Sequence, residues 1–127
     1  MIFDTDIVIW MLRKLRSALD FAETVAPADR NLSVISHLEL LHGCRDPKEL
    51  RELQELVAGW FVQVLPVTPT IGDGAQKIME KFALSRRAGM GDVLIAATAL
   101  QRQEQLATAN RKHFDFIPAL ELKVFRP

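Results

Sequence analysis

The clearest transition from strand to helix in this chain is the segment NLSVISHLELLHGC, residues 31–44. Residues 31–35 are rich in β-forming side chains and follow the break at Pro27, which predicts a short buried strand. Ser36 then opens a predicted helix that continues to about Cys44. A strand that passes so directly into a helix is typical of proteins in which the two kinds of element alternate.

The same alternation extends to both sides of this segment. Further strands are expected at residues 1–4, 62–67 and 106–108, with 120–125 as a candidate fifth, and further helices at 7–15, 17–25, 47–60, 69–83 and 92–101. Strands that alternate with helices imply a parallel sheet covered on both faces. The helix at 92–101 is apolar nearly all round, which places it in the interior. We therefore predict a single α/β domain over residues 1–127.

The composition is that of an ordinary globular domain. The chain has 127 residues, 49% of them hydrophobic and 25% charged, which is enough to bury one core. No apolar run is long enough to cross a bilayer. Asp4 interrupts the short apolar start of the chain, where a secretion signal would need an unbroken apolar stretch. A single cysteine, Cys44, excludes a disulfide within the chain. These features predict a cytoplasmic protein with no membrane partner.

The charge is balanced overall but uneven along the chain. Sixteen basic and sixteen acidic residues give a formal net charge of zero, which argues against a protein that coats nucleic acid. Between residues 85 and 113, however, five basic residues outnumber two acidic ones, a local excess of +3. The basic residues are Arg86, Arg87, Arg102, Arg111 and Lys112. They could form a basic rim around an acidic pocket, or simply lie on solvated helix faces.

Acidic and amide side chains follow three of the predicted strands. Asp4 ends the first strand, Glu39 follows the second within a turn, and Asn110 follows the fourth by two residues. The carboxyl ends of parallel strands share one edge of the sheet, which is where ligands bind in such folds. Asp92 opens the buried helix, and its apolar neighbours offer it no partner. Buried carboxylates are costly, so either their pKa values rise or a cation neutralises them, and an oxygen-rich set favours Mg²⁺ or Mn²⁺.

Each of these residues also has a structural explanation. Asp4 and Asn110 could cap the helical segments that follow them. Ser36 and Glu39 have the spacing of a capping box. Asp92 could be an acid favoured by the dipole at a helix N-terminus. Independent caps need not gather at one edge of a sheet, so the set taken together favours a functional site.

Four segments resemble the PIN-domain toxins of the VapC type. They are FDTD at residues 3–6, SVISHLELLHG at 33–43, GDVLIAATAL at 91–100 and ATANRKHF at 107–114. The resemblance covers essentially the whole chain in the family's order and extends to FIPALEL at 116–122. It implies a three-layer α/β/α sandwich around a mostly parallel sheet of four to five short strands. It also implies an endoribonuclease that uses Mg²⁺ or Mn²⁺ and is inhibited by an antitoxin protein.

The resemblance assigns roles position by position. Asp4, Glu39 and Asp92 match the invariant acids of the family and are the expected metal ligands. Asn110 matches the fourth position, which holds Asp or Asn, and would position a water or a carboxylate. Thr5 and Thr108 match the supporting hydroxyls. Asp6 departs from the pattern, since the family often has Asn there, and is either a second acid near the site or a surface residue.

A set of apolar residues exceeds what one helix face usually hides. Its members are Trp10, Met11, Leu12, Leu15, Leu53, Leu56 and Trp60. With the resemblance in view, this set suggests a groove for an antitoxin helix and a surface for a homodimer. The alternative is that these residues belong to the core.

Two other functions compete with the nuclease. Asp4-Thr5-Asp6-Ile7-Val8 also resembles the opening motif of the haloacid-dehalogenase-like phosphatases, and Gly91-Asp92 resembles a later one. Their closing acid, however, would fall on Ala96, and this reading leaves Glu39 without a role. The second alternative is a non-catalytic PIN-like binding module, which would have little reason to keep unpaired acids.

Overall fold

The structure, a computed structural model, describes residues 1–127 and contains five short strands among six α-helices. The strands are β1 (Ile2–Phe3), β2 (Asn31–Ser33), β3 (Gln63–Leu65), β4 (Leu106–Thr108) and β5 (Leu122–Val124). The helices are α1 (Thr5–Leu12), α2 (Arg16–Glu23), α3 (Val34–His42), α4 (Pro47–Trp60), α5 (Pro69–Arg86) and α6 (Met90–Arg102), with 3-10 turns η1 (Pro27–Asp29) and η2 (Arg111–His113). All strands pair in parallel in the order β3-β2-β1-β4-β5.

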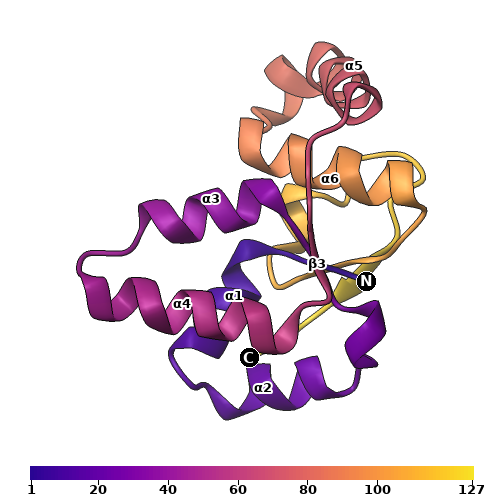
Figure 1. Cartoon of the computed structure of the whole chain (residues 1–127). Helices are drawn as coiled ribbons and strands as arrows, with labels where there is room; N and C mark the ends of the chain where they lie inside the picture. The colour runs from indigo at the N-terminus through magenta and orange to yellow at the C-terminus, as the bar shows by residue number, and fades with distance from the viewer.

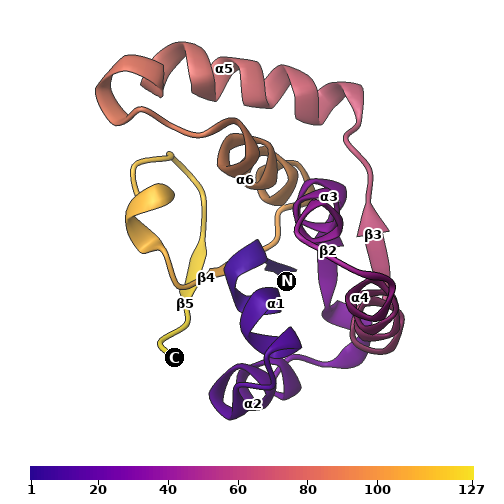
Figure 2. The same ribbon diagram turned by 90° about the vertical axis from the view of Figure 1, so that its left-hand side faces the viewer.

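Helices cover both faces of this sheet, which confirms the predicted three-layer α/β/α sandwich. In Figure 1 and Figure 2, α5 and α6 lie on one side of the strands, with α5 outside α6. Helices α1, α2 and α4 lie on the other side. The alternation of side chains along β1 explains this layout, because Ile2 packs in the core beneath α6 while Phe3 packs against α1 and α2.

The second strand is shorter than expected, and the helix after it begins earlier. Ser33, and not Ser36, is the N-cap of α3, because its hydroxyl accepts a hydrogen bond from the Ile35 backbone N–H at 3.1 Å. Ser36 therefore lies inside α3, so the capping box with Glu39 was wrong. A β-branched pair, Val34-Ile35, had suggested a longer strand, but the serine cap overrides that propensity.

Helix α1 also begins before the expected start. It opens at Thr5 because the Asp4 carboxylate caps it, accepting from the Thr5 backbone N–H at 2.8 Å. Met11 and Leu53, which the sequence had placed in a candidate binding surface, are fully buried core residues. No helix in the structure is long and apolar enough to span a membrane.

Candidate active site

Asp4 directly follows the central strand β1 and is the N-cap of α1. It is 5% exposed, and both carboxylate oxygens are bonded. Oδ1 accepts from the Thr5 backbone N–H, and Oδ2 accepts from the Thr108 hydroxyl at 2.7 Å. Thr108 ends the neighbouring strand β4 and is itself fully buried. One oxygen of the Asp4 carboxylate therefore caps α1, and the other is held by Thr108 at the candidate site.

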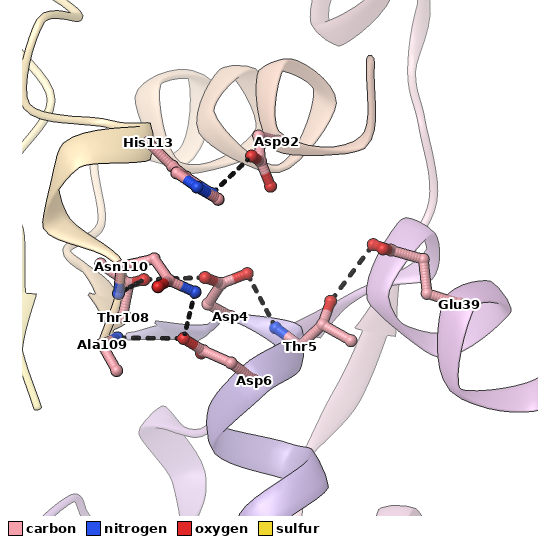
Figure 3. Close-up of polar contacts among 9 residues, drawn as sticks. All are labelled: Asp4, Thr5, Asp6, Glu39, Asp92, Thr108, Ala109, Asn110 and His113. Carbon is pink, nitrogen blue, oxygen red and sulfur yellow. Dashed lines mark hydrogen bonds and ion pairs between the residues drawn. The ribbon is translucent and has the colours of Figure 1, made fainter. Parts of the chain in front are cut away.

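Glu39 reaches the site from the second turn of α3. The Thr5 hydroxyl donates to Glu39 Oε1 at 3.2 Å and lies 2.9 Å from the Ser36 hydroxyl oxygen. Thr5 follows Asp4 directly, so this contact ties Glu39 to the end of β1 (Figure 3). Gly91 stands close by, since a Cβ built on it would lie 3.4 Å from Glu39 Oε1. The absence of a side chain at Gly91 leaves room for this carboxylate beside α6.

Asp92 opens α6 and has a partner that the sequence analysis did not find. His113 Nδ1 lies 3.1 Å from Asp92 Oδ2, with the side chains 57% and 33% exposed. His113 belongs to η2, which follows β4, so the contact joins two segments that cover the carboxyl edge of the sheet. In Figure 3 Asp92 faces Asp4 across the space between α6 and β1. No signal within the 91–101 segment could have identified this partner.

Asp6 belongs to the site, which answers the question left open by the sequence. Its Oδ2 accepts from the Asn110 side-chain amide at 3.0 Å and from the Ala109 backbone N–H at 3.3 Å. Asn110 does not use its side chain to cap η2, because the amide is engaged with Asp6. Thr108 donates to Asp4 while accepting from the Asn110 backbone N–H at 2.9 Å. One short segment, 108–110, thus holds both aspartates.

Burial disfavours ionisation of all four carboxylates, and neighbouring negative charges add to this effect at Asp4, Asp6 and Glu39. Burial and then the charge of Asp6 raise the pKa of Asp4 to about 7, although hydrogen bonds from Thr108 and Thr5 lower it. Burial also raises the pKa of Asp6, Glu39 and Asp92, and the charge of Asp92 contributes to the rise at Asp6 and Glu39. No lysine or arginine pairs with any of the four, so His113 is their one basic contact. No lysine or arginine side chain is close enough to neutralise these carboxylates.

The donor set fits a hard divalent cation that keeps part of its water shell. All the available groups are carboxylate, amide or hydroxyl oxygens, which Mg²⁺ and Mn²⁺ prefer. No three acidic or histidine side chains are arranged to hold one ion directly. Mg²⁺ is usually held by one or two carboxylates and several waters, so this arrangement suits it better than a closed protein cage would.

The structure therefore brings all the residues expected from the sequence to one edge of the sheet. Asp4, Thr5, Glu39, Asp92, Thr108 and Asn110 all take part in the polar contacts drawn in Figure 3. Sequence reasoning missed His113 and left Asp6 unassigned. His113 lies three positions after Asn110, which is the N-cap of η2, but nothing in the sequence indicates that His113 contacts Asp92.

Comparison with known proteins identifies the family of this chain. The PIN domain family model matches residues 1–118. Ribonuclease VapC10 of Mycobacterium tuberculosis is 38% identical over 120 residues, which cover 93% of this chain and 88% of that protein. VapC ribonuclease Mb0625 of Mycobacterium bovis is 37% identical over 114 residues, covering 84% and 86%.

A solved structure shares the fold. That of VapBC2 from Rickettsia felis bound to a promoter DNA fragment superposes with a TM-score of 0.82 at 22% identity, covering 99% of this chain and 100% of the matched chain. At that identity the likeness concerns the fold alone. The family is shown by the match of the PIN domain model to residues 1–118 and by the 38% identity to a VapC ribonuclease. This chain therefore belongs to the PIN-domain family and, within it, to the VapC group.

Proposed function

We propose that this chain is an Mg²⁺- or Mn²⁺-dependent endoribonuclease that acts in the cytoplasm as the toxin of a toxin–antitoxin pair. The observation that carries the proposal is the gathering of Asp4, Asp6, Glu39 and Asp92 at one edge of the sheet without a lysine or arginine among them. Clustered carboxylates with raised pKa values ionise fully near neutral pH only when a cation offsets their charge. The relatives named as ribonucleases supply the substrate class.

We assign each residue of the site a role in metal binding or positioning. Asp4 and Asp92 would hold the principal ion, directly or through water, and Glu39 would help to hold a second ion or orient the attacking water. Such an ion acidifies its bound water and offsets charge on phosphate oxygens. Thr108 and Thr5 fix the orientation of Asp4 and Glu39 through the hydrogen bonds that they donate.

Asn110 acts on the site through Asp6. Its amide holds the Asp6 carboxylate at 3.0 Å, which keeps a second acid beside Asp4. The charge of Asp6 raises the pKa of Asp4, so a bound cation would favour the ionised form of both carboxylates. In this proposal Asn110 positions a carboxylate, which is one of the two roles that the family pattern implies for it.

The competing functions are disfavoured by particular residues. A phosphatase of the haloacid-dehalogenase type would need an acid at position 96, where Ala96 is fully buried in α6. The phosphatase mechanism would also give Glu39 no role, although the Thr5 hydroxyl donates a hydrogen bond to its carboxylate. A non-catalytic module would have no use for four carboxylates with raised pKa values.

Two surfaces that present apolar side chains support the protein partners that we propose. A hollow of about 480 Å³ between α1, α3 and α4 has Ile9, Leu12 and Leu40 in its wall, and Glu39 borders it. An antitoxin segment seated there would lie against the active site. Leu84 and Met90, which are 96% and 78% exposed, leave apolar side chains uncovered near the junction of α5 and α6. That surface is our candidate for a homodimer contact.

Inducible expression of the chain tests the function directly. We expect growth arrest and new RNA 5′ ends at discrete positions with the parent chain, and neither with Asp92→Asn. Asp73→Asn, which neutralises an exposed acid on α5, is the matched control and should behave like the parent. An Asp92→Asn protein that cut RNA at the parental rate would refute the proposal, as would hydrolysis of small phosphoesters but not RNA.

A further inference from the structure

Two hollows adjoin the carboxylates, one on each side. The first is the hollow between α1, α3 and α4, which Glu39 borders. The second, also about 480 Å³, lies between residues 109–113 and 124–127, and we call it the basic hollow. Asn110 and His113 line it. Asn110 also holds Asp6 and His113 also contacts Asp92, so two residues are shared between the wall of the basic hollow and the active site.

The two hollows differ in charge. Arg111, Lys112 and Arg126 line the basic hollow, and no carboxylate side chain does. Lys112 and Arg126 have no ion-pair partner, while Arg111 has a distant one in Asp115 at 4.0 Å. Lys112 and Arg126 are therefore free to contact an anion from solution.

The first hollow is acidic by comparison. Three glutamates, Glu39, Glu49 and Glu52, line it against two arginines, Arg13 and Arg45. Arg45 is already engaged, since its Nε lies 2.8 Å from Glu49 Oε1. A polyanion that approaches the carboxylates therefore meets repulsion on this side and attraction on the other.

We propose that the basic hollow binds the backbone phosphates of single-stranded RNA next to the bond that is cleaved. This inference rests on the proposed nuclease function, because the scissile phosphate must lie among Asp4, Asp6 and Asp92. A strand with one phosphate there continues past Asn110 and His113 into the basic hollow, where Lys112 and Arg126 stand unpaired. Cations that contact phosphates release condensed counterions, so their contribution appears in the salt dependence of binding.

The same arrangement refines the basic rim that the sequence suggested. Of the five basic residues between 85 and 113, Arg111 and Lys112 line the basic hollow, whereas Arg102 pairs with Glu104 and Arg86 stacks over the Phe116 ring at 5.4 Å. Arg126, which the sequence analysis did not single out, completes the cluster. Its place beside η2 comes from β5, which pairs with β4 and so carries the following residues to the same edge.

The test measures binding of a fluorescein-labelled oligouridylate to the full-length chain in EDTA, so that no divalent ion or cleavage is involved. The double variant Lys112→Gln/Arg126→Gln removes the two unpaired charges. Its control, Arg13→Gln/Arg45→Gln, removes the same charge from the first hollow. All four positions are exposed, so both variants should fold, which circular dichroism checks. The affinity is measured over a fourfold range of salt.

We expect the double variant in the basic hollow to lose about 1.4 from the slope of log affinity against log salt, because each phosphate contact on a single strand contributes about 0.7. The parent should then lose roughly sevenfold more affinity across the fourfold salt range than this variant does. The control should keep the parental slope.

Three outcomes would overturn the inference: unchanged slopes in both variants, equal losses in both, or a loss confined to the control. Competition with polyglutamate as strong as with oligouridylate would also overturn it, because the hollow would then take an acidic protein segment. Failure of the nuclease function itself shows separately, as loss of divalent-dependent cleavage with binding intact.

Discussion

His113 Nδ1 and Asp92 Oδ2 stand 3.1 Å apart, and this contact closes the upper side of the carboxylate cluster (Figure 3). His113 lowers the pKa of Asp92, although burial raises it more. Asp4, Asp6 and Glu39 have no such basic neighbour. Asp92 is therefore the one acid of the four whose ionisation is aided by a basic side chain, and the contact also ties η2 to the start of α6.

Replacing His113 should shift the acid limb of the pH–rate profile. His113→Phe keeps a ring but removes the group that lowers the pKa of Asp92, so this pKa should rise. Because Asp92 must be ionised to hold a cation, we expect the acid limb of kcat/KM for RNA cleavage to move to higher pH. His42→Phe, at an exposed position on α3, is the control. An acid limb at the parental pH in His113→Phe would show that the contact does not assist Asp92.

Removing the Thr108 hydroxyl should destabilise the protein in a pH-dependent way. Thr108→Val leaves Asp4 Oδ2 without its donor in a fully buried setting, which costs about 1–3 kcal/mol. The pKa of Asp4 should also rise above its value of about 7. Urea denaturation should therefore show a larger loss at pH 8, where Asp4 is ionised, than at pH 5.

The matched control for that experiment is Thr70→Val, at an exposed position in the first turn of α5. It should change the free energy of unfolding by less than about 0.5 kcal/mol. A loss in Thr108→Val that is equal at both pH values would mean that packing, and not the bond to Asp4, explains the effect.

Without divalent ions the protein should lose stability as the pH rises. The pKa of Asp4 is raised to about 7 in the folded chain from 3.8, so the folded state binds the proton more tightly than the unfolded state does. That contribution is complete below pH 4 and is lost as the pH rises to about 7. Urea denaturation in EDTA from pH 4 to 8 measures it. Asp4→Asn should show a shallower decline, and an identical decline in both proteins would contradict the assignment.

Adding a divalent ion should restore the stability that ionised carboxylates remove. At pH 8, Mg²⁺ or Mn²⁺ at about 100 times its Kd should stabilise the fold by about 2.7 kcal/mol, visible as a higher Tm. The increase should shrink at pH 5, where Asp4 is protonated. Asp92→Asn should lose most of it, whereas Asp73→Asn should keep it. Equal increases in both variants would place the ion elsewhere.

The order and kind of elements could be predicted because local sequence carries them. β-forming runs, caps and apolar periodicity depend on neighbours a few residues away, so strands and helices were expected near their observed places. The boundary at Ser33 was missed because a cap competed with the β-branched pair Val34-Ile35. The strand order β3-β2-β1-β4-β5 was not predicted, since pairing depends on how helices pack on the sheet.

The acids of the candidate site could be predicted from the sequence, but their hydrogen-bond partners could not. Asp4, Glu39 and Asp92 could be chosen from the sequence because each follows or opens an element at the carboxyl edge of a parallel sheet. Their partners could not, since the bonds from Thr108 to Asp4 and from Asn110 to Asp6 each join residues 104 positions apart. The amino-acid sequence alone thus determined which acids are present and which strand ends and helices carry them. Only the tertiary structure decided which hydrogen bonds and charges surround them, because β1 and β4 become neighbours only when the sheet assembles.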